Sequence, residues 1–143
     1  MATALSNKLN RNIGYFFNRK EIKTHGDHGT LVGQLPQPSD MAVMVDDVFT
    51  DGHTKIESVD LVRELCKIEF TAILVALDRM ESSSSGEDAI AEFKLKTGVP
   101  VWSIITIREV CLYLKNRIVK GNVVLDETSY QEIEQYLEKH SIR

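Results

Sequence analysis

The segment that decides the fold reads Met41-Ala42-Val43-Met44-Val45-Asp46-Asp47-Val48-Phe49-Thr50-Asp51-Gly52-His53-Thr54. Its first five residues are continuously apolar, which is typical of a strand buried on both faces of a parallel sheet. Two adjacent carboxylates and a polar turn follow. Thr54-Lys55-Ile56-Glu57 is a capping-box pattern, which predicts a helix running to about Cys66. The segment therefore predicts a strand–loop–helix unit of an α/β protein.

Strands and helices alternate on both sides of this unit. The hydrophobic pattern predicts a helix at 2–9, strands at 13–17, 30–35, 70–77 and 101–105, and helices at 87–96, from a capping box at 106–109 to about 119, and at 129–140. This order is typical of βαβ units with a parallel sheet, in which ligands bind at the carboxyl ends of the strands. The loops after Val45 and Leu77 are therefore the first places to look for a site.

Composition excludes several classes of protein. The 143 residues carry 17 Lys+Arg and 21 Asp+Glu, a net charge of −4, and 43% are hydrophobic, as in an ordinary globular domain. A slightly acidic chain disfavours duplex nucleic acid as a partner. No apolar run approaches the ~18 residues of a membrane span, and the first ten residues lack the features of a secretory signal. Cys66 and Cys111 match no disulfide framework or metal spacing, which favours a reduced, cytoplasmic protein.

The turn after the carboxylates has the chemistry of a phosphate site. Backbone amides and the positive end of a helix dipole attract anions, and small hydroxyl side chains add donors; the turn residues are Thr50, Asp51, Gly52, His53 and Thr54. Asp46 and Asp47 have the oxygen atoms to hold sugar hydroxyls or a hard divalent cation such as Mg²⁺. The alternative interpretation is an acidic turn that simply caps a helix.

The order of these residues is similar to a known motif. A hydrophobic strand, Asp-Asp, two apolar residues and Thr-x-Gly-x-Thr resembles the phosphoribosyl pyrophosphate motif of type I phosphoribosyltransferases. The resemblance implies that Asp46 and Asp47 contact the ribose hydroxyls and that the turn from Thr50 to Thr54 cradles the 5′-phosphate. Thr50 agrees with the orotate branch of that family, since purine-specific members tend to carry an acidic residue there.

Two further segments point to the same branch. The run Arg19-Lys20-Glu21-Ile22-Lys23-Thr24-His25-Gly26 is similar to the mobile catalytic loop of orotate phosphoribosyltransferases, and Leu77-Asp78-Arg79-Met80-Glu81 resembles the segment whose arginine holds the orotate carboxylate. The resemblance implies that the donors of the first segment close over pyrophosphate; they are Arg19, Lys20, Lys23 and His25. From the residues alone, a charged run of this kind is usually a solvated loop, and an arginine after a strand, such as Arg79, is most often part of a surface ion pair. His25 and His28 lack a third metal ligand.

The resemblance covers about residues 1–118, a phosphoribosyltransferase-like core, and leaves 119–143 as a tail with a helix but no functional signal. It implies an enzyme that transfers ribose 5-phosphate from phosphoribosyl pyrophosphate to orotate with Mg²⁺, giving orotidine 5′-phosphate and pyrophosphate in pyrimidine nucleotide synthesis. It also implies a homodimer, or pairing with a complete homologue. Neither nucleic acid nor a membrane is expected as a partner.

The sequence also departs from the family pattern. Complete orotate enzymes have a front section before the equivalent of Met1, so the expected fold is an N-terminally truncated type I phosphoribosyltransferase-like α/β fold with little activity alone. A catalytically impaired fragment or partner subunit that keeps the sugar-phosphate site is one alternative. A nucleic-acid-binding regulator on the same fold is another, against which the net charge counts. Asp51 and His53 replace the usual residues, and a carboxylate beside a phosphate is repelled unless it points outward.

Overall fold

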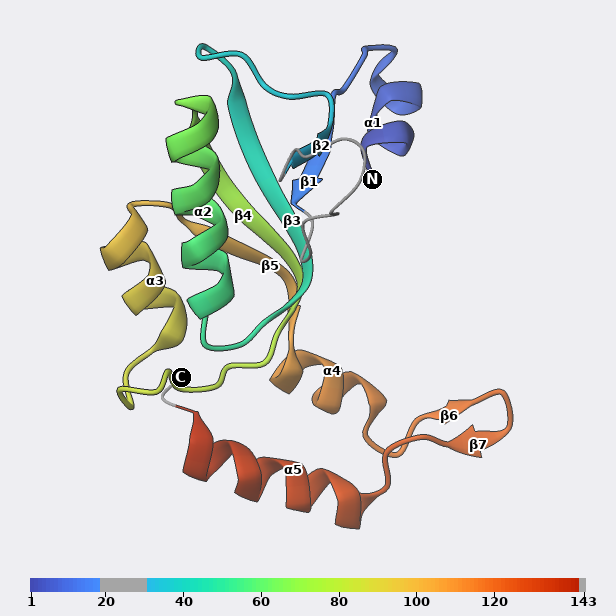
Figure 1. Ribbon diagram of the computed structural model, residues 1–143. Helices are drawn as coiled ribbons and strands as arrows, with labels where there is room; N and C mark the ends of the chain where they lie inside the picture. Colours follow the sequence, from blue (N-terminus) through green and yellow to red (C-terminus); the bar gives the residue numbers. More distant parts are fainter. Residues whose placement is uncertain (19–30, 142–143) are drawn as a thin grey trace, which may run out of the picture. The chain divides into compact units, whose positions relative to one another are not determined.

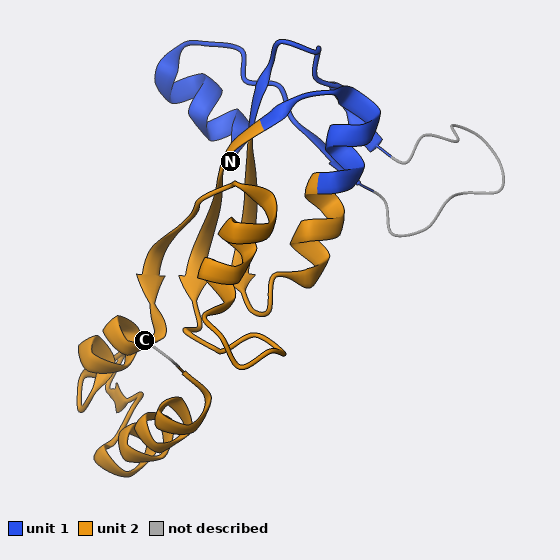
Figure 2. Cartoon of the chain, turned by 90° about the vertical axis from the view of Figure 1, so that its left-hand side faces the viewer, with its two compact units in different colours: residues 1–42, 60–69 blue, residues 43–59, 70–143 orange. Residues whose placement is uncertain are grey.

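The structure is a computed structural model that describes residues 1–18 and 31–141. The chain divides into two compact units, one formed by residues 1–42 and 60–69 and the other by residues 43–59 and 70–143 (Figure 2). The second unit contains most of the parallel sheet and all of the described candidate site residues. No helix in the described part of the chain is both long and apolar enough to cross a bilayer.

The first unit begins with helix α1 (Ala2–Leu9), as the sequence predicts. Strands β1 (Phe16–Asn18) and β2 (Leu31–Gly33) pair antiparallel, with Phe17 opposite Val32. Both strands are shorter than predicted. Gly33 has φ +117°, and a Cβ there would lie 2.4 Å from the Tyr15 carbonyl oxygen, so the close approach of these backbones requires glycine.

The second unit is built on a sheet with the order β3 (Met41–Phe49), β4 (Glu69–Asp78) and β5 (Val101–Thr106), shown in Figure 1. β4 and β5 run parallel, with Ile73 opposite Val101. Helix α3 (Ala89–Thr97) packs against the sheet through Phe93. The Phe93 ring meets the ring of Phe49, the last residue of β3, edge-on with 5.7 Å between centroids. The β-branched side chains of Ile73 and Val75 are fully buried and form the centre of this core.

Local side-chain and glycine signals mark both ends of α3 and the start of the next helix along the chain. The Asp88 carboxylate accepts hydrogen bonds from the Ile90 and Ala91 amides at the start of α3, and Gly98 ends that helix with φ 74°. Thr106 and Glu109 form the predicted capping box at the start of helix α4 (Ile107–Leu114). These local patterns therefore set both ends of α3 and the start of α4.

The tail differs from its prediction. Helix α4 ends at Leu114 rather than near 119, because residues 118–123 form a small hairpin of β6 (Ile118–Val119) and β7 (Asn122–Val123). The turn of this hairpin contains Lys120 and Gly121, both with positive φ. Helix α5 (Glu127–His140) is capped by Asp126, and its first residue lies two positions before the predicted start at 129.

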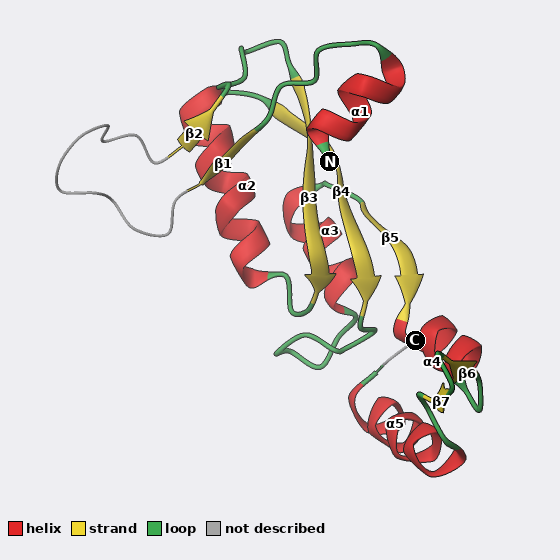
Figure 3. Ribbon diagram, turned by 90° about the vertical axis from the view of Figure 1, so that its right-hand side faces the viewer, coloured by secondary structure: helices red, strands yellow, loops and turns green. Residues whose placement is uncertain are grey.

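The prediction that 41–45 is buried on both faces is wrong. Met41, Val43 and Val45 are 80%, 52% and 47% exposed. Within the second unit, α3 and the start of helix α2 (His53–Cys66) lie behind the sheet, on the far side from the viewer in Figure 3. Residues alternate between the two faces of a strand, so one face of β3 meets these helices while the other keeps exposed apolar side chains.

Candidate functional site

Asp46 and Asp47 lie near the carboxyl end of β3. Asp46 Oδ2 lies 2.7 Å from Nζ of Lys55 in the first turn of α2, so Asp46 faces the helices. The two carboxylates therefore have different surroundings, although the sequence presents them as a pair.

Lys55 and Asp46 form a partly buried ion pair. The Lys55 side chain is only 9% exposed, and its ammonium also lies 5.5 Å from the centre of the Phe49 ring. The Asp47 amide donates to Asp46 Oδ1 at 2.9 Å. Burial opposes ionisation of Asp46, but the hydrogen bonds from Lys55 and the Asp47 amide outweigh it and lower the pKa of Asp46 below its usual value. Asp46 is therefore a charged group held in place.

The turn that opens α2 centres on Gly52. The Gly52 carbonyl accepts hydrogen bonds from the Lys55 and Ile56 amides at 3.1 and 3.0 Å, so α2 begins at His53. The predicted capping box at Thr54 is wrong, because Thr54 lies inside the first turn. Glu57 instead lies 3.7 Å from the exposed His53 ring. The first-turn amides of α2 thus follow directly after the turn, as a phosphate site requires.

Replacing Gly52 with alanine is expected to destabilise the protein by about 2 kcal/mol. Gly52 has φ +75°, and an added Cβ would lie 2.8 Å from Cζ of Phe49, which packs on Phe93. Gly86→Ala is the matched control, since Gly86 has φ +82° with nothing within 4 Å. It should cost only about 1 kcal/mol in urea unfolding. Equal losses in the two variants would contradict tight packing at Gly52.

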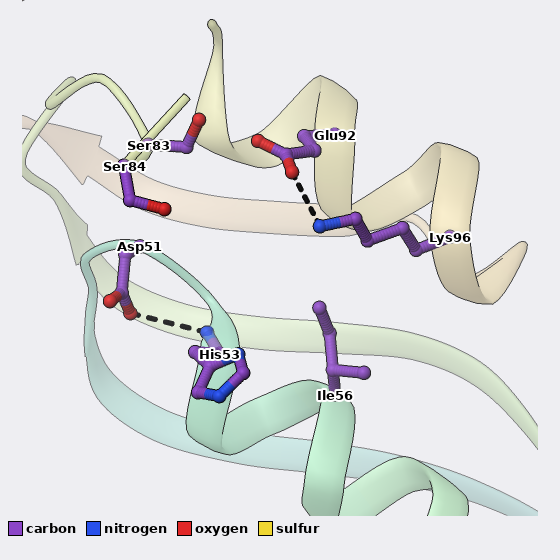
Figure 4. Close-up of a pocket in the computed structure, with 7 residues that line it drawn as sticks. All are labelled: Asp51, His53, Ile56, Ser83, Ser84, Glu92 and Lys96. Atoms are coloured by element: carbon purple, nitrogen blue, oxygen red, sulfur yellow. Dashed lines mark hydrogen bonds and ion pairs between the residues drawn. The ribbon is translucent and has the colours of Figure 1, made fainter. Parts of the chain in front are cut away.

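The Asp51 side chain turns back onto the start of α2. Its Oδ1 accepts a hydrogen bond from the His53 amide at 3.1 Å (Figure 4). A carboxylate at this position satisfies one of the amides that a phosphate would use. Asp51 is predicted to contact the phosphate. In the structure its carboxylate occupies the His53 amide, for which a bound anion would compete.

A pocket of about 220 Å³ adjoins the turn, between α2, α3 and the loop after β4 (Figure 4). The lining residues are Asp51, His53, Ile56, Ser83, Ser84, Glu92 and Lys96. Hydrogen bonds from Lys96, then from Ser83 and Ser85, lower the pKa of Glu92 to about 2. The lining thus holds two carboxylates, those of Asp51 and Glu92, and the Lys96 ammonium that pairs with Glu92.

Arg79 follows the end of β4, as predicted, and lies outside this pocket. Its Nη2 atom pairs with Glu81 Oε1, and the Arg79 side chain is 45% exposed. The surface ion pair considered from the sequence is therefore present. A guanidinium has five N–H donors, so pairing with Glu81 leaves donors for a second carboxylate.

The structure brings most of the predicted sugar-phosphate residues into one short segment. Thr50 is half-buried before the turn, and Thr54 is exposed in the first turn of α2. The predicted pyrophosphate donors Arg19, Lys20, Lys23 and His25 lie outside the described residues. No group of three or more potential metal-ligating side chains occurs within residues 1–18 and 31–141.

Comparison with known proteins gives consistent results. A scan against models of protein families finds no match. The orotate phosphoribosyltransferase of Clostridium acetobutylicum is 32% identical over 143 residues, which is all of this chain and 64% of that protein. The orotate phosphoribosyltransferase of Agathobacter rectalis is 33% identical over 144 residues, covering 99% of this chain and 64% of the relative.

The whole chain is similar in sequence to orotate phosphoribosyltransferases. It spans just under two thirds of the length of the curated relatives it matches. The crystal structure of orotate phosphoribosyltransferase from Francisella tularensis superposes with a TM-score of 0.70 at 23% identity, covering 98% of this chain and 62% of that one. This likeness confirms the type I phosphoribosyltransferase fold predicted from the sequence.

Sequence reasoning missed one residue of the site. The sequence predicts Lys55 only as one residue of a capping box. In the structure, Lys55 forms an ion pair with Asp46 and neutralises its charge. A signal was present, because Lys55, Val59 and Val62 follow the i, i+4, i+7 spacing of a buried helix face, and all three are buried. A lysine on such a face requires an anionic partner.

Proposed function

We propose that the protein transfers ribose 5-phosphate from phosphoribosyl pyrophosphate to orotate, giving orotidine 5′-phosphate and pyrophosphate in pyrimidine nucleotide synthesis. The bond from the ribose C1 atom to pyrophosphate breaks and a bond from C1 to a pyrimidine nitrogen forms. The observation that carries the proposal is the arrangement at the end of β3, in a chain matched over its whole length by orotate phosphoribosyltransferases. There, two carboxylates precede a glycine turn that opens a helix.

The described residues supply groups for the sugar end of the reaction. Asp47 is exposed and accepts hydrogen bonds from the ribose hydroxyls, while the ion pair with Lys55 holds Asp46 beside it. The amides of Gly52, His53 and Thr54 and the hydroxyls of Thr50 and Thr54 bind the 5′-phosphate. Phosphate binding displaces the Asp51 carboxylate from the His53 amide.

Mg²⁺ is the proposed cofactor, and the donor set fits it. Mg²⁺ is commonly held by one or two carboxylates together with substrate phosphates and water rather than by an all-protein cage. Asp47 is an exposed carboxylate of this kind. When bound, the ion neutralises charge on the pyrophosphate leaving group.

The leaving group is assigned to the segment that resembles the family's catalytic loop. Four side chains with hydrogen-bond donors are available there, those of Arg19, Lys20, Lys23 and His25. A donor directed at developing negative charge contributes about 3–4 kcal/mol in other enzymes. Lys23 is the proposed main catalytic residue, and closure over pyrophosphate excludes water.

Arg79 is proposed to recognise the orotate carboxylate by a charge-assisted pair. We expect Arg79→Ala to weaken orotate binding about fivefold to tenfold, because exposure limits what one such pair contributes. Uracil, which lacks the carboxylate, should bind the parent and the variant equally in isothermal titration. If Arg79→Ala weakened the binding of both orotate and uracil, or of neither, carboxylate recognition by Arg79 would be contradicted.

A second candidate function is a partner subunit that keeps the sugar-phosphate site without turnover. The occupation of the His53 amide by Asp51 favours it. A homodimer, or pairing with a complete homologue, is part of both proposals, and the exposed side chains of Val43 and Val45 support association. A cytoplasmic location remains a prediction from the sequence.

A further inference from the structure

The C-terminal helix α5 contacts the loop that follows β4. The Tyr136 hydroxyl donates to Glu81 Oε1 at 3.2 Å, across 55 positions of sequence. The Ser82 amide donates to the His140 carbonyl oxygen at 2.8 Å. Figure 1 shows this loop running past the end of α5. Two neighbouring residues of the loop are thus held by one helix of the tail.

Glu81 connects this contact to Arg79. The same Oε1 atom that accepts from Tyr136 pairs with Nη2 of Arg79, and the Glu81 side chain is only 18% exposed. The intervening residue, Met80, has φ 58°, and its amide donates to Asp78 Oδ1 at 2.8 Å. This turn places Arg79 and Glu81 side by side at the end of β4. Tyr136, Glu81 and Arg79 therefore form a hydrogen-bonded chain that ends at an accessible guanidinium.

Helix α5 is itself well anchored. Leu137 is 2% exposed, and Arg108 of α4 donates to Glu134 of α5 at 3.0 Å. The Tyr136 ring also stacks on the His140 ring, with 4.5 Å between centroids. The Tyr136 hydroxyl is consequently presented from a fixed element. An arginine held in one orientation loses less side-chain entropy when it binds a carboxylate than an arginine free to rotate.

We infer that Tyr136 is a positioning residue that acts through Glu81 on Arg79 and so raises the affinity of the site for a pyrimidine carboxylate. The inference rests on the proposed function, which places that carboxylate at Arg79. It assigns a role to the tail, residues 119–143, in which the sequence carries no functional signal. Tyr136 itself does not touch substrate in this account.

Tyr136→Phe tests the inference in the full chain, because it removes the hydroxyl and keeps the ring against His140. We expect orotate to bind about three- to fivefold more weakly in isothermal titration, while the affinities for uracil and ribose 5-phosphate stay unchanged. Tyr130→Phe is the matched control on the same helix, since the Tyr130 ring lies under Lys115 rather than against Glu81. It should bind orotate as the parent does.

A second measurement uses no ligand. Relaxation of the Arg79 Nε–H group, measured by nuclear magnetic resonance, should show a more mobile guanidinium in Tyr136→Phe than in the parent or in Tyr130→Phe. Unchanged mobility would overturn the inference, whatever the ligand results.

The two proposals fail in different ways. If Arg79→Ala weakens orotate binding and Tyr136→Phe does not, the positioning role is wrong and the proposed function stands. If the parent binds no orotate, the proposed substrate is wrong, and if Arg79→Ala binds orotate as well as the parent does, carboxylate recognition by Arg79 is wrong. The role of Tyr136 at a carboxylate site is then overturned with it.

Discussion

Replacing Asp47 with asparagine is expected to weaken the binding of ribose 5-phosphate by about ten- to a hundredfold, since hydrogen bonds to charged groups contribute roughly 1.5–3 kcal/mol and 1.4 kcal/mol is a factor of ten. Asp46 already accepts from Lys55 and from the Asp47 amide. Asp47 is therefore the carboxylate that remains for the ribose hydroxyls, directly or through Mg²⁺. Isothermal titration in the presence of Mg²⁺ measures the change.

Two other aspartates serve as controls for this experiment. Asp60→Asn changes an exposed aspartate on α2 and should leave the affinity unchanged. Asp51→Ala should be neutral or should tighten binding, because it frees the His53 amide and removes a negative charge beside the phosphate. Equal affinities for Asp47→Asn and the parent would remove the assignment of this turn as the sugar-phosphate site.

Replacing Lys55 with methionine is expected to destabilise the protein by about 2–3 kcal/mol at neutral pH. Methionine keeps the apolar contacts of the lysine stem, but it leaves Asp46 partly buried without its cation. Breaking a fully buried pair costs about 3–5 kcal/mol, and the 45% exposure of the Asp46 side chain reduces that figure. Lys94→Met, at an exposed position of α3, should change stability little.

The effect of Lys55→Met should depend on pH in a defined direction. The pKa of Asp46 is lowered from 3.8 in the folded protein, so the ion pair stabilises the fold fully above that pH and is lost as the pH falls through the lowered folded value. The stability difference between parent and variant should therefore be constant near neutral pH and shrink below about pH 4. Urea unfolding at several pH values measures it. A difference that grows on acidification would contradict the pairing.

Much of this architecture could be predicted from local sequence. The capping residues at Thr106 and Glu109, the glycine that ends α3, and the apolar run of β4 act over a few positions, so their signals are visible without the fold. The sugar-phosphate turn was visible for the same reason. Its carboxylates and its glycine lie within one short segment that leads into a helix.

The remainder depends on contacts between distant residues. Asp46 differs from Asp47 because it is paired with Lys55. The sequence predicts Lys55 only as a residue of a helix. The apolar run of β3 gave no sign that one of its faces stays exposed, because hydrophobicity does not show how many faces are covered. The link from Tyr136 to Glu81 spans 55 positions, and no local pattern encodes it.

The most direct test of the central claim is the formation of orotidine 5′-phosphate from orotate and phosphoribosyl pyrophosphate with Mg²⁺. Because the chain spans 64% of the Clostridium acetobutylicum relative, the assay uses residues 1–143 alone and mixed with the unmatched section of that relative. We expect little or no product from the chain alone, since misplacement of reacting groups costs on the order of a hundredfold.

In the mixture, the account predicts that orotidine 5′-phosphate forms, that Lys23→Ala abolishes most of it, and that Asp60→Asn leaves it unchanged. Robust turnover by residues 1–143 alone would show that the unmatched section is dispensable. Absence of product from a mixture that binds both substrates, or product formation that survives Lys23→Ala, would contradict the claim that these residues carry orotate phosphoribosyl transfer.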